Sequence, residues 1–212
     1  MRTAPAQKSE MSIPGLFPTP QKISNTGNFF TIPQKLNFFC SDENLSEGIT
    51  PWAGKLALRH AESIEQANLV VQKESFGHPE AYSLELKNDQ LTLTTGTASG
   101  VFRGLSKVFQ VLQFNEAGTK IPGFVIEDSP TLNRRGFMLD ISRCKVPTME
   151  ELFRLIDLLA LIGYNELQLY IEHTFEFKEH KTVWKDASPV SAEEIQQIDR
   201  YCAERFLSLI HI

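Results

Sequence analysis

The hydrophobic pattern is most informative in residues 134–143, where a near-continuous apolar run begins at Gly136. Such a run is typical of a strand that is buried on both faces of a parallel sheet. The run breaks into Asp140, Ser142 and Arg143, so the predicted strand presents polar side chains at its C-terminal end. In a barrel of alternating strands and helices, this end of the strands is where the chemistry takes place.

A helix and a second strand are predicted directly after this first strand. Thr148 is a suitable N-cap, and Glu150 and Glu151 follow in the first turn, where negative charge is favourable. Leucine and isoleucine then recur at helical spacing, and Gly163 is expected to end the helix. Because residues 166–171 form the next strand, we expect two parallel strands joined by a right-handed connection.

A second helix is predicted at residues 192–206, with Ile195, Ile198 and Cys202 facing inward, and a third strand begins after it. The segment between residues 173 and 190 shows no clear periodicity. Long loops of this kind are usually functional or disordered.

The residues before 128 predict an α+β domain. Its expected strands cover residues 29–32, 35–40, 69–72, 81–86 and 90–94, and its expected helices cover residues 51–66 and 97–112. The last two strands alternate with period two, so they should form an antiparallel hairpin with one covered face. Small residues in the last helix, Gly100 and Gly104 among them, would let it lie close on the sheet. Residues 1–11 are expected to be a disordered tail.

Composition excludes several classes of protein. The 212 residues are 42% hydrophobic and 22% charged, which is typical of a soluble globular protein. A net charge of -5 argues against a nucleic-acid partner. No run of about 20 apolar residues is present to span a membrane, and residues 1–10 lack the apolar core of a secretory signal, so a cytoplasmic location is expected. Cys40, Cys144 and Cys202 lack metal-ligand spacing and are expected to be reduced thiols, mostly buried.

Four segments in series carry a more specific signal. They are Ala-Ser-Gly-Val-Phe-Arg-Gly-Leu at 98–105, Ile-Glu-Asp-Ser-Pro at 126–130, Arg-Gly-Phe-Met-Leu-Asp-Ile-Ser-Arg at 135–143, and Leu-Ile-Asp-Leu-Leu-Ala at 155–160. Together, and in this order, they resemble the family 20 glycoside hydrolases, the β-N-acetylhexosaminidases. The resemblance covers roughly residues 20–206.

The resemblance implies both a fold and a reaction. The fold is an α+β accessory domain followed by a TIM (β/α)₈ barrel. The residue pattern places the accessory domain, an antiparallel sheet with covering helices, at residues 12–127. The reaction removes terminal N-acetylhexosamine from a glycan, with the substrate's own acetamido oxygen as nucleophile and with no metal or nucleotide cofactor. An adjacent Asp-Glu pair on a later strand orients the acetamido group and protonates the leaving oxygen.

The chain is expected to be a fragment that ends early in the barrel. Such a barrel needs ~250 residues, far more than residues 128–212 can supply, and the Asp-Glu pair would lie beyond residue 212. We therefore expect the chain alone to be inactive. The family usually has a glycine where this chain has Phe206, which is a departure from the pattern.

The candidate residues are substrate-binding ones. Arg143 matches the family arginine that binds hydroxyls of the terminal sugar; the alternative is a structural salt bridge with Asp140. Glu172 matches an Asp that accepts a hydrogen bond from a ring hydroxyl, although the family's usual His-x-His and Asp-Asp pattern is absent here; the alternative is a solvated or structural acid. His173 is either a further ligand or a packed histidine, and Trp184 is either a wall of the sugar subsite or an anchor of its loop.

Two other functions stay open. The chain could be a carbohydrate-binding or regulatory module that has lost catalysis, or it could come from a glycosidase with a related barrel, such as a relative of the O-GlcNAc hydrolases. The sequence leaves the linkage, the preference for gluco or galacto sugars and the oligomeric state undetermined.

Overall fold

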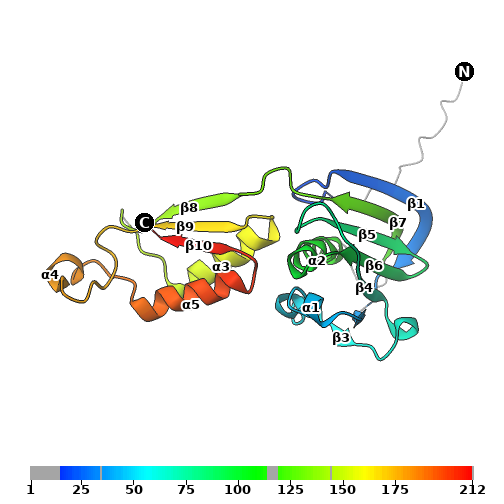
Figure 1. The fold of residues 1–212 in the computed structure, drawn as a ribbon, viewed down its shortest axis with the longest axis horizontal. Coiled ribbons are helices and arrows are strands. Elements are labelled where there is room, and N and C mark those ends of the chain that lie inside the picture. Colours follow the sequence, from blue (N-terminus) through cyan, green and yellow to red (C-terminus); the bar gives the residue numbers. More distant parts are fainter. Residues whose placement is uncertain (1–14, 34, 114–118, 144, 212) are drawn as a thin grey trace, which may run out of the picture.

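A computed structural model describes residues 15–33, 35–113, 119–143 and 145–211, and its strands form two separate sheets (Figure 1). The predicted tail at residues 1–11 and Cys144 lie outside the described residues. Figure 1 shows the seven-stranded sheet and the three-stranded sheet side by side, joined by the segment that runs from β7 to β8.

The seven-stranded sheet is mixed, which corrects the expectation of an antiparallel sheet. Its order is β1-β7-β5-β6-β4-β2-β3. The strands are β1 (Lys22–Thr31), β2 (Asn37–Cys40), β3 (Arg59–His60), β4 (Leu69–Lys73), β5 (Tyr82–Lys87), β6 (Gln90–Thr95) and β7 (Lys120–Asp128). The β1–β7, β7–β5 and β5–β6 pairs are antiparallel, whereas β6–β4, β4–β2 and β2–β3 are parallel. Period-two alternation reveals a half-covered strand but not the direction of its neighbour.

The predicted hairpin is present as β5 and β6. Asn88 and Asp89 connect the two strands with φ of 51° and 60°, the left-handed conformation that a tight two-residue turn requires. Strand β7 was not predicted. It inserts beside β5 after the last helix, and Glu127 and Asp128 end it. The sequence predicts residues 127–130 as a short turn-rich link between the two domains, but the first two of them belong to this strand.

The predicted helix at residues 51–66 is wrong. Two short 3-10 helices, η1 (Thr50–Trp52) and η2 (Ile64–Gln66), flank β3 in this stretch, and α1 (Glu43–Ser46) precedes them. The apolar residues Trp52 and Leu56 are buried, as a helix would have them. However, the chain turns at Ala57, whose φ is 48°, and then pairs with β2. The buried apolar residues are therefore spaced along the sequence as in a helix, although most of this stretch is not helical.

Helix α2 (Ala98–Gln113) confirms the prediction that small residues let a helix lie close on the sheet. A Cβ atom on Gly100 would lie 2.0 Å from Thr95 Oγ1 and 2.9 Å from the carbonyl oxygen of Ala81. A Cβ atom on Gly104 would lie 2.2 Å from a methyl group of Leu93. Gly100 is therefore required by the close approach of the helix to the sheet, whereas a methyl group on Gly104 would force the buried Leu93 side chain to shift.

The second sheet has three parallel strands in the order β10-β9-β8. The predicted parallel pairing of the first two strands is confirmed, and the third strand begins after the second helix as expected. They are β8 (Gly136–Asp140), β9 (Glu166–Tyr170) and β10 (Ser208–His211), and they alternate with α3 (Met149–Leu161) and α5 (Ala192–Ala203). A short helix, α4 (Lys181–Trp184), interrupts the loop before α5. Helices α3 and α5 lie on the same side of the strands (Figure 1).

The expectation that the first of these strands is buried on both faces is wrong. β8 is an edge strand, and its Met138 is 57% exposed. On β9, in contrast, Leu167 and Leu169 are fully buried. Helices cover only one face of this sheet, so the other face of β8 stays open.

The ends of α3 follow the sequence signals. Thr148 is the N-cap, and its side chain and that of Glu151 form a reciprocal capping box. Gly163, with φ of 86°, lies just past the C-terminus in the left-handed conformation that favours glycine. Helix α5 begins with the same type of box at Ser191.

Replacing Thr148 by alanine should lower the free energy of unfolding by about 1 kcal/mol, because the Glu151 amide loses its side-chain acceptor. Urea unfolding followed by circular dichroism measures the change. Thr182→Ala, at an exposed position of α4, is the matched control and should stay within about 0.5 kcal/mol of the parent. Equal effects of the two changes would contradict a capping role.

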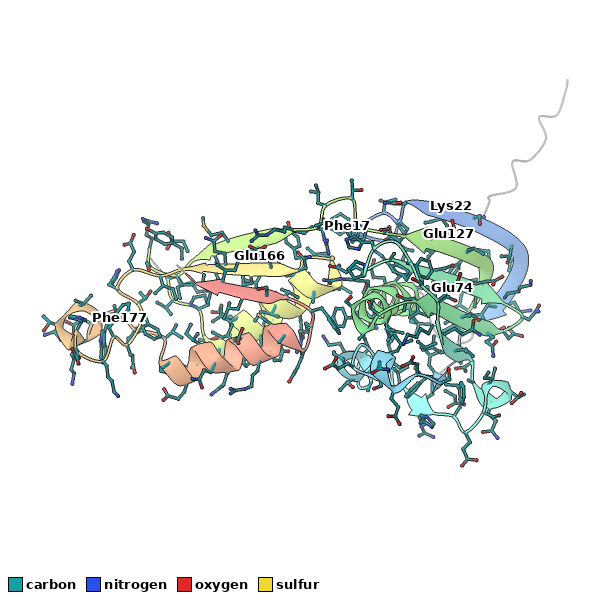
Figure 2. The ribbon with its side chains drawn as sticks, in the orientation of Figure 1. Phe17, Lys22, Glu74, Glu127, Glu166 and Phe177 are labelled. Atoms are coloured by element: carbon teal, nitrogen blue, oxygen red, sulfur yellow. The ribbon has the colours of Figure 1, made fainter. Side chains whose placement is uncertain are left out.

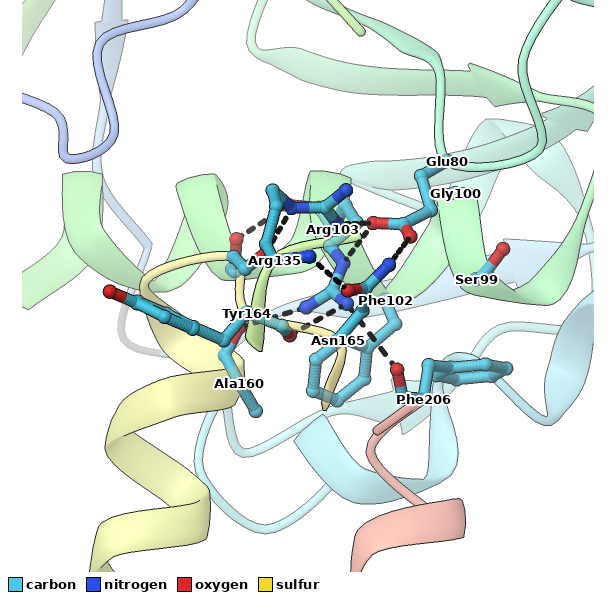
Figure 3. Close-up of polar contacts among 12 residues, drawn as sticks. Glu80, Ser99, Gly100, Phe102, Arg103, Arg135, Ala160, Tyr164, Asn165 and Phe206 are labelled. Carbon is cyan, nitrogen blue, oxygen red and sulfur yellow. Dashed lines mark hydrogen bonds and ion pairs between the residues drawn. The ribbon is translucent and has the colours of Figure 1, made fainter. Parts of the chain in front are cut away.

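A buried polar cluster, which we call the junction cluster, joins the two sheets (Figure 3). It consists of Glu80, Arg103, Arg135 and Asn165. Arg103 Nε donates to Glu80 Oε2 at 2.8 Å, and Arg135 also pairs with this carboxylate. Asn165 Nδ2 donates to Glu80 Oε1 at 3.1 Å. The cluster therefore gathers charges from α2, the β4–β5 loop and the start of β8 around one carboxylate.

Arg103 also binds the end of α3 directly. Its Nη1 donates to the carbonyl of Ala160 and its Nη2 to that of Tyr164, both at 3.0 Å. A third carbonyl, that of Phe206, lies 3.5 Å from Nη2. Because the last carbonyls of a helix lack partners within the helix, a buried guanidinium is well matched to them.

Phe206 stands in the left-handed conformation, with φ of 57°. Glycine adopts this conformation without steric cost, whereas other residues lose about 1 kcal/mol or more. This geometry explains why a glycine would suit the position. Its ring packs against Phe102 of α2, with 5.5 Å between centroids, so the substituted side chain contributes a contact between the two sheets.

Two of the three cysteines lie among the described residues. Cys40 is partly buried and Cys202 is fully buried, and both are free thiols. Burial raises the pKa of Cys202 to about 12, so its thiol is protonated at neutral pH. In the part of the chain described here, none of the helices has both the length and the apolar character needed to cross a membrane.

Candidate functional site

Two neighbouring parallel strands bring the main candidate residues together. Arg143 follows the end of β8 and Glu172 follows the end of β9, and the register pairs Asp140 with Tyr170 just before them. Arg143 Nη2 lies 3.0 Å from Glu172 Oε1, and its Nη1 pairs with Asp140 Oδ2. The Tyr170 hydroxyl donates to the same Glu172 oxygen at 2.7 Å. Arg143 and Glu172 therefore lie at the same end of the sheet, the carboxyl end of its parallel strands, where the chemistry of such a fold is expected.

The backbone around this pair is held by short side chains. The amides of Ser142 and Arg143 donate to Asp140 Oδ1 at 2.9 and 3.1 Å, which folds the chain sharply after β8. The amide of Glu172 donates to Ser142 Oγ at 2.6 Å, and that hydroxyl also lies 3.0 Å from Thr174 Oγ1. Ser142 therefore ties the end of β9 to the turn that carries Arg143.

The local charges and hydrogen bonds favour the ionised forms of Asp140 and Arg143. The amide of Ser142, followed by Arg143, holds the pKa of the Asp140 carboxyl below its usual range. The Asp140 carboxylate and the Tyr170 hydroxyl raise the pKa of Arg143. The Arg143 guanidinium also lies 5.0 Å from the centroid of the Tyr170 ring, within range of a cation–π contact.

The pair is open to solvent. The side chains of Arg143 and Glu172 are 62% and 46% exposed, whereas Asp140 is 29% exposed. Exposed ion pairs contribute at most about 1 kcal/mol to folding, so stability alone is a weak reason for this arrangement. A guanidinium with free donors beside a carboxylate with free acceptors can bind neighbouring hydroxyls of one sugar ring.

His173 and Trp184 are placed differently from this pair. His173 lines a shallow cleft of about 430 Å³ together with Lys145, Thr174 and Asp186, next to the turn at Ser142. Trp184 lies in the α4 loop, and its indole N–H donates to the carbonyl of Phe177 at 2.8 Å. Figure 2 places Phe177 in this loop, away from the strands. Within the described residues, Trp184 has no hydrogen bond with Arg143 or Glu172.

Sequence reasoning missed two contributors to the site. It assigned no role to Tyr170 or Thr174, although Tyr170 ends the polar row of β9 and Thr174 is only 2% exposed. Their position in the sequence could have identified them, since both lie within four residues of the carboxyl end of a predicted strand. The described residues hold no group of three or more His, Cys, Asp and Glu that could bind a metal ion.

Residues 13–129 match the protein family described as glycosyl hydrolase family 20, domain 2. Among curated proteins, the chain is 30% identical over 186 residues to the β-hexosaminidase subunit alpha of Bos taurus, covering 74% of this chain and 34% of that protein. It is 24% identical over 189 residues to the β-hexosaminidase subunit B1 of Dictyostelium discoideum, covering 82% and 32%. The chain thus spans about a third of the length of these relatives.

Solved structures show the same fold. The β-N-acetylhexosaminidase of Bacteroides fragilis superposes with a TM-score of 0.80 at 19% identity, covering 92% of this chain and 44% of that one. The GH20 β-N-acetylhexosaminidase of Streptomyces coelicolor A3(2) also gives a TM-score of 0.80, at 20% identity, covering 92% and 45%. At these identities the structural similarity concerns the fold.

Proposed function

The chain belongs to glycosyl hydrolase family 20, and on this premise we propose that it forms the N-terminal part of an exo-β-N-acetylhexosaminidase. In this proposal residues 12–127 are the accessory α+β domain, and residues 128–212 are the first βα units of a (β/α)₈ barrel. The alternation of β8, α3, β9, α5 and β10 with parallel strands supports the second assignment. The curated β-hexosaminidases that it resembles support the activity.

The observation that carries the proposal is the Arg143–Glu172 pair at the carboxyl ends of two adjacent parallel strands. In a barrel this edge faces the substrate. Arg143 donates to hydroxyls of the terminal N-acetylhexosamine, and Glu172 accepts from a neighbouring hydroxyl. His173 is a further ligand from the adjacent cleft, and Trp184 is a wall of the sugar subsite.

The chemical step needs groups that these residues do not supply. In the substrate-assisted mechanism, the 2-acetamido oxygen attacks the anomeric carbon while an acid protonates the leaving oxygen. The adjacent acids Asp42 and Glu43 do not fit this task, because Asp42 is the N-cap of α1 and pairs with Lys73 at 2.6 Å. We therefore propose that the catalytic Asp-Glu pair is absent from residues 1–212, and that these residues alone are inactive.

Purified polypeptide of residues 1–212 should release no nitrophenol above the blank from 4-nitrophenyl N-acetyl-β-glucosaminide. Turnover that disappears on replacing Arg143 or Glu172 would contradict the proposed inactivity. The full-length protein tests the activity itself. We propose that an in-frame continuation of the gene beyond codon 212 encodes an adjacent Asp and Glu. A full-length product without hydrolytic activity would contradict the proposed function.

In that full-length product, Arg143→Met should lower kcat/KM by about tenfold or more, since a charge-assisted hydrogen bond is worth roughly 1.5–3 kcal/mol. Arg134→Met is the matched control. Arg134 is an exposed arginine just before the start of β8, at the opposite end of the strand, and it pairs with Glu166 at 2.8 Å, so its loss should leave kcat/KM nearly unchanged. Equal effects of the two variants would remove Arg143 from the sugar site.

A carbohydrate-binding module is the second candidate, and the preformed Arg143–Glu172 pair is the observation that favours it. Titration of residues 1–212 with N-acetylglucosamine, followed by NMR of backbone amides, separates the two functions. Saturable shifts at Ser142, Arg143 and Glu172 without any hydrolysis in the full-length product would favour the module. If no saturable shifts appear at these residues and the full-length product hydrolyses the substrate, the enzyme is favoured.

A further inference from the structure

A cavity of about 280 Å³ lies between the two sheets, beside the segment that joins β7 to β8. Its apolar walls include Pro18, Tyr82, Leu132 and Leu161. Figure 2 labels Phe17, the neighbour of Pro18, at this crossing between the sheets. The cavity is far from the strand ends that carry the Arg143–Glu172 pair, because it adjoins the start of β8 and not its end. Its size is at the small end of ligand pockets.

The cavity contains a buried lysine with spare hydrogen-bonding capacity. Lys107 of α2 is 3% exposed and lines the cavity. Its ammonium donates to the carbonyl of Pro18 at 2.7 Å, which uses one of three N–H donors. Within the described residues, none of the ion pairs closer than 4.0 Å involves Lys107. A buried charge of this kind is costly unless a counter-charge accompanies it.

Both carboxylates in the cavity wall, Glu80 and Asp128, already accept hydrogen bonds from groups other than Lys107. Glu80 pairs with Arg103 and Arg135. Asp128 of β7 accepts from the Tyr82 hydroxyl at 3.1 Å, and its other oxygen accepts from the amides of Ser129 and Gln21. Three cationic side chains thus face two carboxylates in the wall. The wall therefore holds one more cation than carboxylates, and Lys107 is the cation in it without an ion pair closer than 4.0 Å to any described residue.

The guanidinium groups leave little for a ligand to bind. Arg103 donates to Glu80 and to carbonyls at the end of α3, and Arg135 donates to Glu80 and to the carbonyls of Gly163 and Leu132. These bonds also cover the negative end of the α3 dipole, which would otherwise repel an anion. Lys107 is therefore the cation that keeps two of its three N–H donors and has no carboxylate partner among the described residues.

We propose that this cavity binds a small organic monoanion, with a carboxylate head on the Lys107 ammonium and an apolar body against Tyr82, Leu132 and Leu161. One unpaired cation matches a single negative charge, and the apolar walls favour a hydrophobic body. The site is separate from the proposed sugar site, and it would place a ligand at the junction between the sheets.

The protonation state of Lys107 gives the proposal a pH dependence. Burial, opposed by the charge of Asp128 and reinforced by that of Arg103, lowers the pKa of Lys107 to about 8. The other ionisable groups that face it are Glu80, Arg135 and the Tyr82 hydroxyl, whose pKa is raised by burial and by Asp128. The ammonium form is favoured at pH 7 and is lost as the pH rises through the pKa, so anion affinity should fall between about pH 7 and pH 9.5.

Benzoate is the probe and benzamide is its neutral control. At pH 7, benzoate should shift the NMR amide signals of Thr19, Ser106, Lys107 and Leu132 saturably, and benzamide should bind at least about tenfold more weakly, since a hydrogen bond to a charged group is worth roughly 1.5–3 kcal/mol. The affinity for benzoate should fall at least about tenfold at pH 9.5. Equal binding of the two probes, no binding, or unchanged affinity at pH 9.5 would each overturn the proposal.

Two variants locate the effect. Lys107→Met keeps the length of the side chain and removes the charge, so it should lose at least about tenfold in benzoate affinity. Lys22→Met is the control, because Lys22 is an exposed cation that pairs with Glu127 of the same sheet. Circular dichroism tests whether both variants fold. If Lys107→Met does not fold, the pH dependence of benzoate binding to the parent chain still tests the proposal. These measurements do not involve hydrolysis, so they stand or fall separately from the proposed function.

Discussion

Replacing Glu80 by glutamine should lower the free energy of unfolding by about 3–5 kcal/mol at pH 7. Glu80 is the single carboxylate that accepts from both Arg103 and Arg135, and its side chain is 11% exposed. The amide of a glutamine keeps the shape but removes the charge, which leaves two largely buried guanidinium groups uncompensated. Breaking a buried ion pair on one side costs more than the pair contributes when intact.

The size of this effect should depend on pH. Burial opposes ionisation of Glu80, but the charges of Arg103 and Arg135 and the hydrogen bonds from Arg103 and Asn165 outweigh it, so the pKa of Glu80 lies below its usual value. A carboxyl with a lowered pKa in the folded state contributes stability above its unfolded pKa and loses it as the pH falls through the folded pKa. The difference between the parent chain and Glu80→Gln should therefore narrow below about pH 4.

Urea unfolding at pH 7, 5 and 3 tests both statements about Glu80. The matched control is Glu127→Gln, which removes an exposed carboxylate from a surface pair with Lys22 and should cost less than about 1 kcal/mol. Equal stability of Glu80→Gln and Glu127→Gln at pH 7 would contradict the proposed role of the junction cluster. So would a difference in the free energy of unfolding between the parent and Glu80→Gln that does not change with pH.

Replacing Gly100 by alanine should destabilise the chain by about 3 kcal/mol, although the same change usually stabilises a helix by about 1 kcal/mol. The new methyl group would overlap Thr95 Oγ1, which donates to the carbonyl of Ala81 at 2.7 Å. Thr95 is fully buried and the Ala81 carbonyl is backbone, so neither atom can move away easily. Overpacking therefore outweighs the gain in helix propensity.

Thermal unfolding by calorimetry measures whether Gly100→Ala lowers the stability of the chain, where a Gly→Ala change in a helix usually raises it. The control is Gln113→Ala, at an exposed position of the same helix, which should be neutral or slightly stabilising. A Gly100→Ala chain as stable as the parent would mean that α2 does not need its close approach to β5 and β6.

The candidate site was largely predictable from the sequence because its signals are local. The polar residues that end each strand, the N-cap at Thr148 and the stop at Gly163 together define a strand, helix, strand unit. Two parallel strands in such a unit bring their carboxyl ends to one edge, so the sequence positions of Arg143 and Glu172 place both residues at that edge. The support from Tyr170 and Thr174 needed the side-chain directions.

The sequence by itself determined the family resemblance, the β5–β6 hairpin, the limits of α3 and the edge where Arg143 and Glu172 meet. Caps, turn residues and hydrophobic periods act over a few residues, so a single stretch of chain encodes them. Only the tertiary structure decided the mixed strand order, the insertion of β7, the reversal at Ala57 and the exposure of Met138. The same is true of the junction cluster, where Glu80 and Asn165 meet across 85 positions of sequence, because strand neighbours and buried charge partners depend on contacts between residues that are distant in the chain.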